Sequence, residues 1–555
     1  MGIRPELHLK KKADKFVMPP ARYVMSTKEM DTFFRTLKDI KVPDGYSSNI
    51  SRCVNVKDRK IMGLKSHDCH VLMECLLPIT LRGLLPEDVY DAVSEFCMFF
   101  KALCTQVLNI ADLDKLEDRI AITLCKLEKI FPPGFFVVMM HLPIHLPQQA
   151  KDAGPVQYLW MYPIERYLRK LKSYVRNKAC PEGSMAEAYL IEESPTMLTR
   201  YLNSTDTKFN RVSRNEDYEQ PPSREKLVVF RQSGRPIGAE TLGTLKDSEM
   251  QQIQLYALQN TAEVEPYENE HREELKRRGI RDVDVERRHN EEFPFWFASK
   301  IYQLHKNGMV SDELYSLSQG PNKECSSFNG YIINGFRFHT KAWEMRWKTQ
   351  NSGVCIKGGE GEDDDMNDYY GVVYEIIEAR YLNQLQILFF KCNWRPVANQ
   401  GGSKRDNYGF TCVNLNRTCY ANEPFALAHQ AQQVFYMKDI KNRQLEVVIK
   451  TRPRCSYNIP KKNSVELIAP ENSSSDEAYQ EWYSSYSIND LKRVPQQDHN
   501  ENLVWDRTDV LPETISHEEV IATIQRQEEE EEEADSDAVY TTDEDDDFEL
   551  GDMGF

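Results

Sequence analysis

One glutamate followed by a run of basic residues has the residue types and spacing that could do chemistry. The acid is Glu165, and the basic residues after it are Arg166, Arg169, Lys170, Lys172, Arg176 and Lys178. A carboxylate can bind a divalent metal ion, and basic side chains on one helix face are typical of a nucleic-acid-binding surface. Two interpretations are open. In the first, Glu165 is a metal ligand beside a phosphate-binding surface. In the second, Glu165 is an acid at the start of a helix whose basic residues face solvent.

The residues around Glu165 predict the helix that would position these side chains. Pro163 suits the first position of a helix, where its missing N–H costs nothing, and Glu165 lies in the first turn, near the positive end of the helix dipole. Apolar residues recur at helical spacing and share one face; they are Ile164, Leu168, Leu171 and Val175. We therefore expect an amphipathic helix with a buried apolar face and a basic face.

Two groups of histidines raise the alternative of a metal site. The first group is His67 and His70 with Cys69 and Cys75, and the second is His141 with His145. A zinc site needs three or four ligands, and no spacing in the sequence fixes the remaining ones. We therefore expect core or capping histidines and no bound metal or cofactor.

The net charge of −17 is concentrated at the C-terminal end of the 555 residues. Residues 517–555 hold 17 acidic residues and one arginine, which gives 1 − 17 = −16 and leaves about −1 for the rest. A basic helix can therefore matter on a nearly neutral body. The acidic tail has too little apolar surface to offset the entropy of ordering, so we expect it to be disordered and to serve solubility, protein partners or DNA mimicry.

The cysteines and the hydropathy pattern indicate the compartment. The 13 cysteines include no Cys-x-x-Cys pair, and the first residues do not resemble a targeting peptide. We therefore expect a reduced, intracellular protein. No run of 18 apolar residues occurs, so we expect no membrane span.

The periodicity of apolar residues predicts an α+β fold. Residues 26–37, 89–108 and 113–127 repeat apolar side chains at helical spacing, and a short strand is expected over 226–231. After residue 325 the pattern changes to short β-rich runs, with Asn334-Gly335 as a hairpin turn. We expect a mainly helical N-terminal region, then a small antiparallel β domain and the disordered acidic tail.

Several motifs resemble those of plant CACTA (En/Spm-type) transposases, in their C-terminal part. They are MGIRPELH at 1–8, GLKSHDCHV at 63–71, LPITLRG at 77–83 and WMYPIERYL at 160–168. Residues of about 100–205 resemble the plant domain-of-unknown-function family 4218. Residues of about 370–438 resemble family 4216, through YGV at 370–372, FKCNW at 390–394, DNYG at 406–409 and PF at 424–425. The segments NGFRFHT at 334–340 and TQNSGV at 349–354 match the linking region.

The resemblance implies an RNase H-like core with an Asp-Asp-Glu triad that holds two metal ions. Glu165 matches the third acid. The two aspartates lie upstream of the segment that matches residues 1–8, so this sequence lacks them, and residues 1–164 do not show the buried strands of such a sheet. A single carboxylate cannot hold two ions, so Mg²⁺ is expected only if the aspartates are supplied by another chain.

We therefore expect a nuclear, transposon-derived protein without nuclease activity of its own, with DNA as a candidate partner through the basic residues after Glu165. One alternative is a protein-interaction scaffold that uses the β domain and the acidic tail. Another is a split enzyme, which requires a large uncovered apolar surface.

The resemblance also suggests a division into five segments. Residues 1–99 are expected to be a helical remnant of the transposase core and its insertion, 100–205 the 4218-like helical domain, 206–324 a mixed helical linker, 325–455 the 4216-like β domain, and 456–555 the extension and tail.

Overall fold

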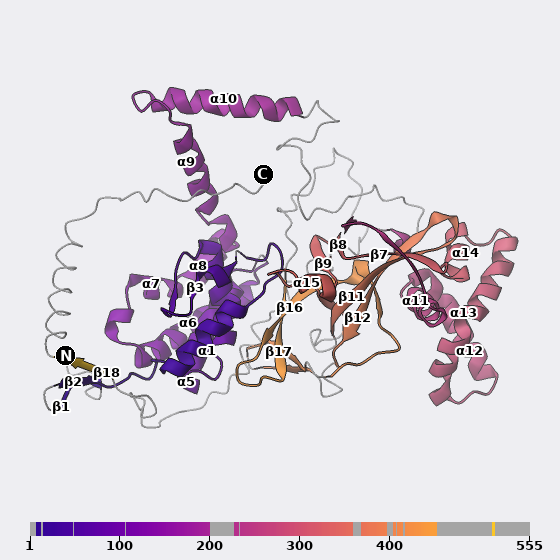
Figure 1. Cartoon of the computed structure of the whole chain (residues 1–555), viewed down its shortest axis with the longest axis horizontal. Helices are drawn as coiled ribbons and strands as arrows, with labels where there is room; N and C mark the ends of the chain where they lie inside the picture. Colours follow the sequence, from indigo (N-terminus) through magenta and orange to yellow (C-terminus); the bar gives the residue numbers. More distant parts are fainter. Residues whose placement is uncertain are drawn as a thin grey trace.

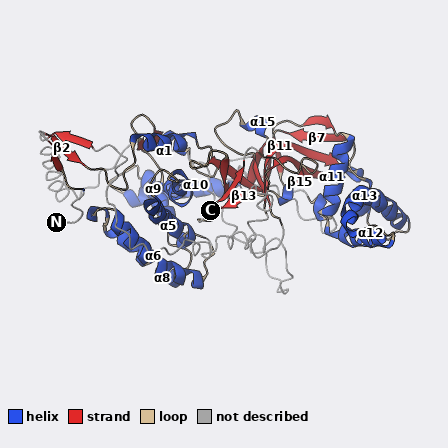
Figure 2. Ribbon diagram, turned by 90° about the horizontal axis from the view of Figure 1, so that it is seen from below, coloured by secondary structure: helices blue, strands red, loops and turns tan. Residues whose placement is uncertain are grey.

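The computed structural model describes residues 7–12, 15–47, 49–105, 107–199, 227–231, 234–358, 368–396, 403–406, 408–414, 417–451 and 513–516. The acidic tail from residue 517 lies outside the described residues, so the disorder expected for it stays a prediction. The fold is α+β, as the sequence predicts. A helical N-terminal body lies at one end, an antiparallel sheet lies beside it, and a second group of helices lies beyond the sheet (Figures 1 and 2).

The helical body is built on the stripes that the sequence predicts. Helix α1 (Thr27–Asp39) begins at Ser26, whose side chain accepts from the Glu29 N–H while Glu29 accepts from the Ser26 N–H. This reciprocal capping box fixes the helix start. Helices α5 (Glu87–Leu103) and α6 (Ile110–Ile130) pack against each other. The predicted stripe of α6 is buried: Leu113, Leu116, Ile120, Leu124 and Leu127.

Short elements complete the body. They are β1 (Lys10–Lys12), β2 (Lys15–Met18), α2 (Ile50–Cys53), β3 (Val54–Asn55), β4 (Lys60–Ile61), α3 (Ser66–Val71), the π-helical η2 (Leu72–Leu76), α4 (Leu77–Thr80), η3 (Pro133–Phe135), α7 (Val138–His141), η4 (Leu142–Ile144), α8 (Leu146–Ala153) and η5 (Val156–Tyr158). Strand β18 (Glu513–Ser516) pairs with β2. Helices α9 (Tyr162–Tyr174) and α10 (Pro181–Thr199) follow the body.

The predicted β domain is present as an antiparallel sheet. Among the described residues ten strands form it, in the order β13-β14-β17-β16-β10-β11-β12-β15, with β7 pairing β11 and β6 pairing β7. The bounds are β6 (Thr241–Thr244), β7 (Glu324–Phe328), β10 (Gly353–Ile356), β11 (Tyr369–Arg380), β12 (Gln386–Trp394), β13 (Ser403–Arg405), β14 (Thr411–Asn414), β15 (Phe425–Leu427), β16 (Gln432–Lys438) and β17 (Leu445–Lys450). Helix α15 (Lys341–Glu344) and the 3₁₀ turns η9 (Leu382–Gln384) and η11 (Ala428–Gln430) lie in its connections.

The Asn334-Gly335 hairpin is confirmed. It joins β8 (Gly330–Ile333) to β9 (Phe336–His339), and Ile333 is paired with Phe336. Both turn residues have positive φ, 53° and 71°, which is the geometry of a tight primed turn and explains the Asn-Gly pair. Strand β5 (Arg235–Ile237) adds to the other side of β8.

The prediction of a strand over residues 226–231 is wrong. Residues Val228–Phe230 form the 3₁₀ turn η6. Val229 and Phe230 are buried in the core under the second group of helices. A short apolar run fits a buried strand or a buried turn equally well, so periodicity alone cannot separate them.

The second group of helices covers the far part of the sheet. It comprises α11 (Asp247–Gln259), α12 (Glu265–Arg277), α13 (Asp282–Lys306) and α14 (Asp312–Gln319). Phe293 and Phe297 of α13 lie in one core with Phe389 of β12 and Leu427 of β15. This burial anchors the helices to the sheet.

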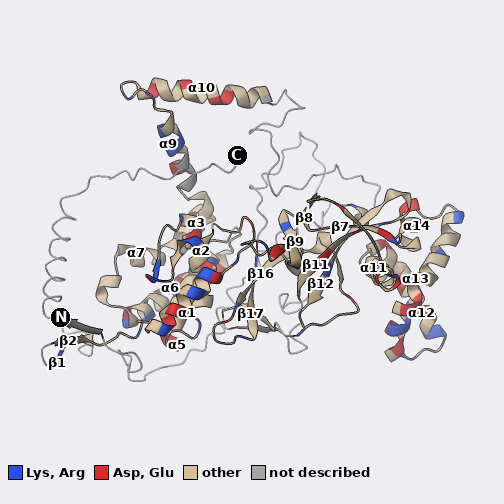
Figure 3. Cartoon of the chain, in the orientation of Figure 1, with Lys and Arg blue, Asp and Glu red and all other residues tan. Residues whose placement is uncertain are grey.

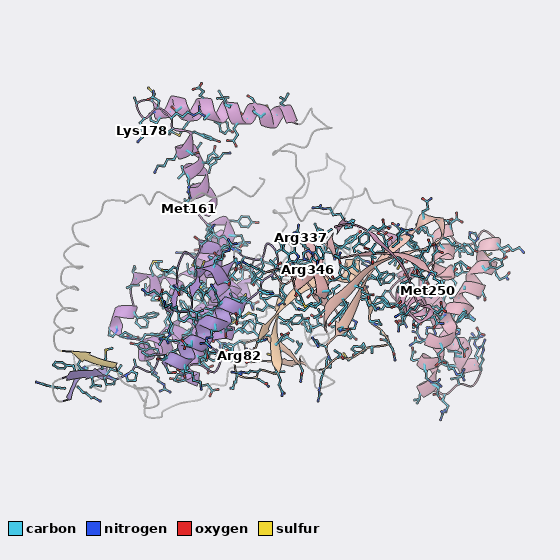
Figure 4. All side chains as sticks on the ribbon, in the orientation of Figure 1. Arg82, Met161, Lys178, Met250, Arg337 and Arg346 are labelled. Carbon is cyan, nitrogen blue, oxygen red and sulfur yellow. The ribbon has the colours of Figure 1, made fainter. Side chains whose placement is uncertain are left out.

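Arg82 joins the helical body to the other end of the sheet (Figure 4). Its Nη1 lies 2.9 Å from Asp439 Oδ2, and its Nη2 contacts Asp406 Oδ2. Burial alone would lower the pKa of Arg82, but the facing carboxylate of Asp406 raises it, so the guanidinium stays charged. Tyr408, beside Asp406, donates to Asp91 of α5.

We expect Arg82→Ala to destabilise the protein by about 3–5 kcal/mol, because it leaves two buried carboxylates without their cation. Urea denaturation followed by circular dichroism measures the change. The matched control is Arg22→Ala, which breaks a more exposed pair with Asp88 and should cost about 0–1 kcal/mol. Equal losses in the two variants would contradict the role given to Arg82.

A second buried polar contact lies between α12 and α13. The Nδ1 atoms of His271 and His289 are 2.9 Å apart, so one ring must donate and the other accept. Both rings are buried, and the two Nε2 atoms have no hydrogen-bond partner within the described residues. Burial lowers the pKa of His271 and lowers that of His289 to about 4. The pair is therefore stable only in its neutral form.

This pair predicts a loss of stability in acid. Between pH 6.5 and about 4 the unfolded chain binds a proton at His289 that the folded chain does not bind, so stability falls as the pH falls through this window. At the lower end of this pH window, the loss in the free energy of unfolding that is due to His289 reaches about 3 kcal/mol. Urea midpoints measured from pH 7 to pH 4 should show a smaller decline for His289→Gln than for the exposed-site control His67→Gln. Parallel declines would refute this assignment.

Candidate nucleic-acid interface

The helix predicted around Glu165 is present as α9, and it is shorter than the run of basic residues. Pro163 lies in its first turn, and the Glu165 N–H donates to the Met161 carbonyl at 2.8 Å. The helix ends at Tyr174, so Arg176 and Lys178 lie in the turn that follows. Asn177 closes this turn, because its side chain accepts from the Ala179 N–H at 3.0 Å and its own N–H donates to Ser184 Oγ.

Helices α9 and α10 form an arm that projects from the helical body (Figure 1). We call residues 162–199 the α9–α10 arm. Lys170 Nζ of α9 lies 2.6 Å from Glu192 Oε1 of α10, and both side chains are partly exposed. This ion pair crosses between the two helices and sets part of their mutual geometry.

The prediction that the apolar face of α9 is buried is wrong for the first half of the helix. Ile164 is 49% exposed and Leu168 is 58% exposed, while Leu171 and Val175 are half-buried. Helix α10 also exposes apolar side chains; they are Tyr189, Leu190, Ile191, Met197 and Leu198. Helical periodicity shows that a face is apolar, but it does not show which element covers it, and the described part of this chain supplies none for Ile164 and Leu168.

The basic side chains of the predicted site are exposed wherever the structure describes them: Arg169, Lys170, Lys172, Arg176 and Lys178. The side chain of Arg166 lies outside the described residues, although its backbone is part of α9. Helix α10 carries glutamates and no basic residue, so the two helices of the arm differ in charge (Figure 3). Met161 and Lys178 mark the two ends of the basic segment (Figure 4).

Glu165 is exposed on the first turn of α9. Among the described residues, the group of three potential metal ligands that lie close together is His70, Glu74 and Cys104, and Glu165 is not part of it. The structure thus places Glu165, Arg166, Arg169, Lys170 and Lys172 on one helix and Arg176 and Lys178 in the turn after it. Among the described residues, no further carboxylates are gathered around Glu165.

The two histidine groups have separate environments. His141 and His145 contact each other through their Nε2 atoms at 3.2 Å and are partly or fully exposed. His67 is exposed, whereas His70 Nδ1 lies 3.0 Å from Glu74 Oε1. Sequence reasoning missed Glu74 and Cys104. The four-residue spacing from His70 to Glu74 was a usable signal, but Cys104 lies on another helix and no local pattern points to it.

Two family matches were found for the chain. The family described as "Domain of unknown function (DUF4218)" matches residues 103–216, and "Domain of unknown function (DUF4216)" matches residues 377–448. Both domains are typical of plant transposase-like proteins. The predicted resemblance to these two families is confirmed, and each match covers less than half of the chain. No curated protein and no solved structure matches.

The matched regions place the arm and the central strands within known families. The first match contains α6, α9 and α10, and the second contains β12, β14, β16 and the last four residues of β11. None of the described helices combines the length and the apolar character needed to cross a membrane.

The exposure of Leu168 leads to a direct test. We expect Leu168→Ala to change the free energy of unfolding by less than about 0.5 kcal/mol, because the side chain contacts mostly solvent. Leu116→Ala, in the core between α6 and its neighbours, should cost about 2–5 kcal/mol. Urea denaturation of both variants gives the comparison. A cost above about 2 kcal/mol for Leu168→Ala would mean that a partner or another segment covers this face in solution.

Proposed function

We propose that this chain is a transposon-derived protein of the CACTA (En/Spm) type that binds DNA in the nucleus without cutting it on its own. The observation that carries the proposal is the succession of exposed basic side chains along α9 and the following turn. The two family matches support a transposase-like origin, and the basic segment lies inside the first of them.

The basic segment suits phosphate binding better than base recognition. Arg169 and Lys172 are three residues apart and so share a helix face, and Arg176 lies a further turn along the chain. Lys170 is engaged with Glu192 across the arm and therefore contributes less. Long, exposed and closely spaced cations bind the DNA backbone through counterion release, which carries little sequence information.

Glu165 supports the non-catalytic part of the proposal. Two-metal phosphoryl transfer requires several carboxylates that bridge the ions, and none of the described residues forms such a set with Glu165. Glu165 is a family-level candidate for the third acid, and it would hold Mg²⁺ only with two aspartates from outside this sequence. The five-segment division of the chain belongs to the same proposal.

A second candidate function is supported by the exposed apolar side chains of the arm. Ile164, Leu168, Leu190 and Ile191 are each about half exposed or more, and such surfaces are typical of protein interaction sites. A scaffold that binds protein partners through the arm, the β domain or the acidic tail would use this surface, and so would a split enzyme whose second chain brings the aspartates.

Salt dependence of DNA binding separates these functions. We expect the full chain to bind a labelled duplex of random sequence, and log K to fall linearly with log salt. The variant Arg169→Ala/Lys172→Ala/Arg176→Ala should bind more weakly and reduce the slope by about 2–3, since each lost phosphate contact removes roughly 0.9. Fluorescence anisotropy at four or more salt concentrations gives both values.

The matched control removes three exposed basic residues from the second group of helices, in the variant Lys276→Ala/Arg277→Ala/Lys306→Ala. This variant changes the net charge by the same amount as the arm variant does, and it should leave the slope of log K against log salt unchanged. An arm variant with an unchanged slope would refute DNA binding by the arm, and equal effects of both variants would show that only net charge matters. Pull-down of a protein that depends on Leu168 or Ile191, without DNA retention, would favour the scaffold.

A further inference from the structure

We propose that His70, Glu74 and Cys104 form a binding site for a zinc-type divalent metal ion. One ligand atom from each of these three side chains lies within 4.8 Å of the others, so a single ion can contact all three after small side-chain adjustments. All three residues are half-buried, which leaves access for an ion from solvent. The proposal is independent of DNA binding by the arm.

The backbone places these three side chains together from two helices. His70 lies in the last turn of α3, and Glu74 lies in the π-helical turn η2 that continues it. The Leu77 N–H donates to the Leu72 carbonyl five residues back, which defines the π turn. Cys104 is the C-cap of α5, and its N–H donates to the Phe100 carbonyl at 2.9 Å. Short π turns inside α-helices are frequent at functional sites.

The chemistry of the three groups selects the ion. An imidazole nitrogen, a carboxylate oxygen and a thiolate sulfur form a mixed set that suits Zn²⁺. Mg²⁺ and Ca²⁺ prefer oxygen ligands alone. Three protein ligands leave a fourth tetrahedral position for water or for another ligand. His70 Nδ1 and Glu74 Oε1 lie 3.0 Å apart, so the two ligand atoms already face each other.

The neighbouring thiols point to Cys104 as the sulfur ligand. Cys69 and Cys75 are the sequence neighbours of His70 and Glu74, but neither belongs to the close group of ligand atoms. Cys69 is exposed, and Cys75 Sγ accepts a hydrogen bond from the Tyr46 hydroxyl at 3.4 Å. Cys97 is buried in the core, and burial raises its pKa to about 12, so it does not supply a thiolate readily. Cys104 is half-buried and not in a disulfide.

Trp160 lies close enough to His70 for its fluorescence to report metal binding at the site. Its ring centroid lies 5.3 Å from that of His70, and its side chain is half-buried. Trp160 lies two residues before the start of α9, so an ion at this site would fix the part of the body from which the arm projects. The site therefore links the segment 63–71 to the segment 160–168, which the sequence shows only as two separate motifs.

The test uses the full chain, stripped of metal with a chelator and then titrated with Zn²⁺ or Co²⁺. We expect Co²⁺ to give a thiolate charge-transfer band and tetrahedral visible bands, and to quench tryptophan fluorescence less in Trp160→Phe. We expect His70→Gln, Glu74→Gln and Cys104→Ser each to weaken Zn²⁺ binding at least about 100-fold, since loss of even an outer partner costs 10–100-fold. Isothermal titration calorimetry measures the binding.

The matched controls are His67→Gln on the same helix and the exposed-thiol variant Cys125→Ser, which should bind like the unaltered chain. Absence of the Co²⁺ thiolate band in the unaltered chain would overturn the proposal without any variant. Equal losses in the control and ligand variants would overturn it as well, because binding would then be spread over surface groups. Far-ultraviolet circular dichroism confirms that each variant is folded before titration.

Discussion

The contact on which the rest of the structure depends is the buried guanidinium of Arg82 between Asp406 and Asp439. The partners are separated from Arg82 by 324 and 357 positions along the chain. Together with the hydrogen bond from Tyr408 to Asp91, this cation joins the helical body to the outer strands of the sheet. The apolar core also spans both parts, because Phe435, Met437 and Val447 of the sheet are buried in one cluster with residues of α5 and α6. A shifted placement of the two apolar surfaces would leave a buried charge without its partner, which is costly.

Much of the local structure could be predicted from the sequence, because local structure has local causes. The stripe of leucines in α6, the capping box at Ser26 and the Asn334-Gly335 turn each depend on residues within a few positions of one another. The contacts that assemble the protein could not be predicted in this way. Arg82 with Asp406, and Cys104 with Glu74, combine residues from motifs that the sequence presents separately. The helix around Glu165 was correctly predicted, but it ends before Arg176 and Lys178. The length of that helix and the exposure of Ile164 depend on what surrounds it.

The α9–α10 arm combines properties that point to binding more than to catalysis. It carries exposed cations on one helix, glutamates on the other and uncovered apolar side chains on both. Under the proposed function, a surface of this kind would gain free energy both from phosphate contacts and from burial against a partner. The half-buried cluster of His70, Glu74 and Cys104 lies next to Trp160, where the arm begins. A ligand bound at this cluster would therefore lie at the base of the arm.

The shared core of the helical body and the outer strands also governs how the chain folds during synthesis. Residues 33–150 complete their core only with residues 408–449, so the body emerges from the ribosome on the order of tens of seconds before its last strands are made. Long-range closure of this kind lowers the folding rate more than the final stability. Through that interval the face of α5 that later meets Tyr408 and Phe410 remains open to solvent, and exposed apolar surface of this kind promotes aggregation.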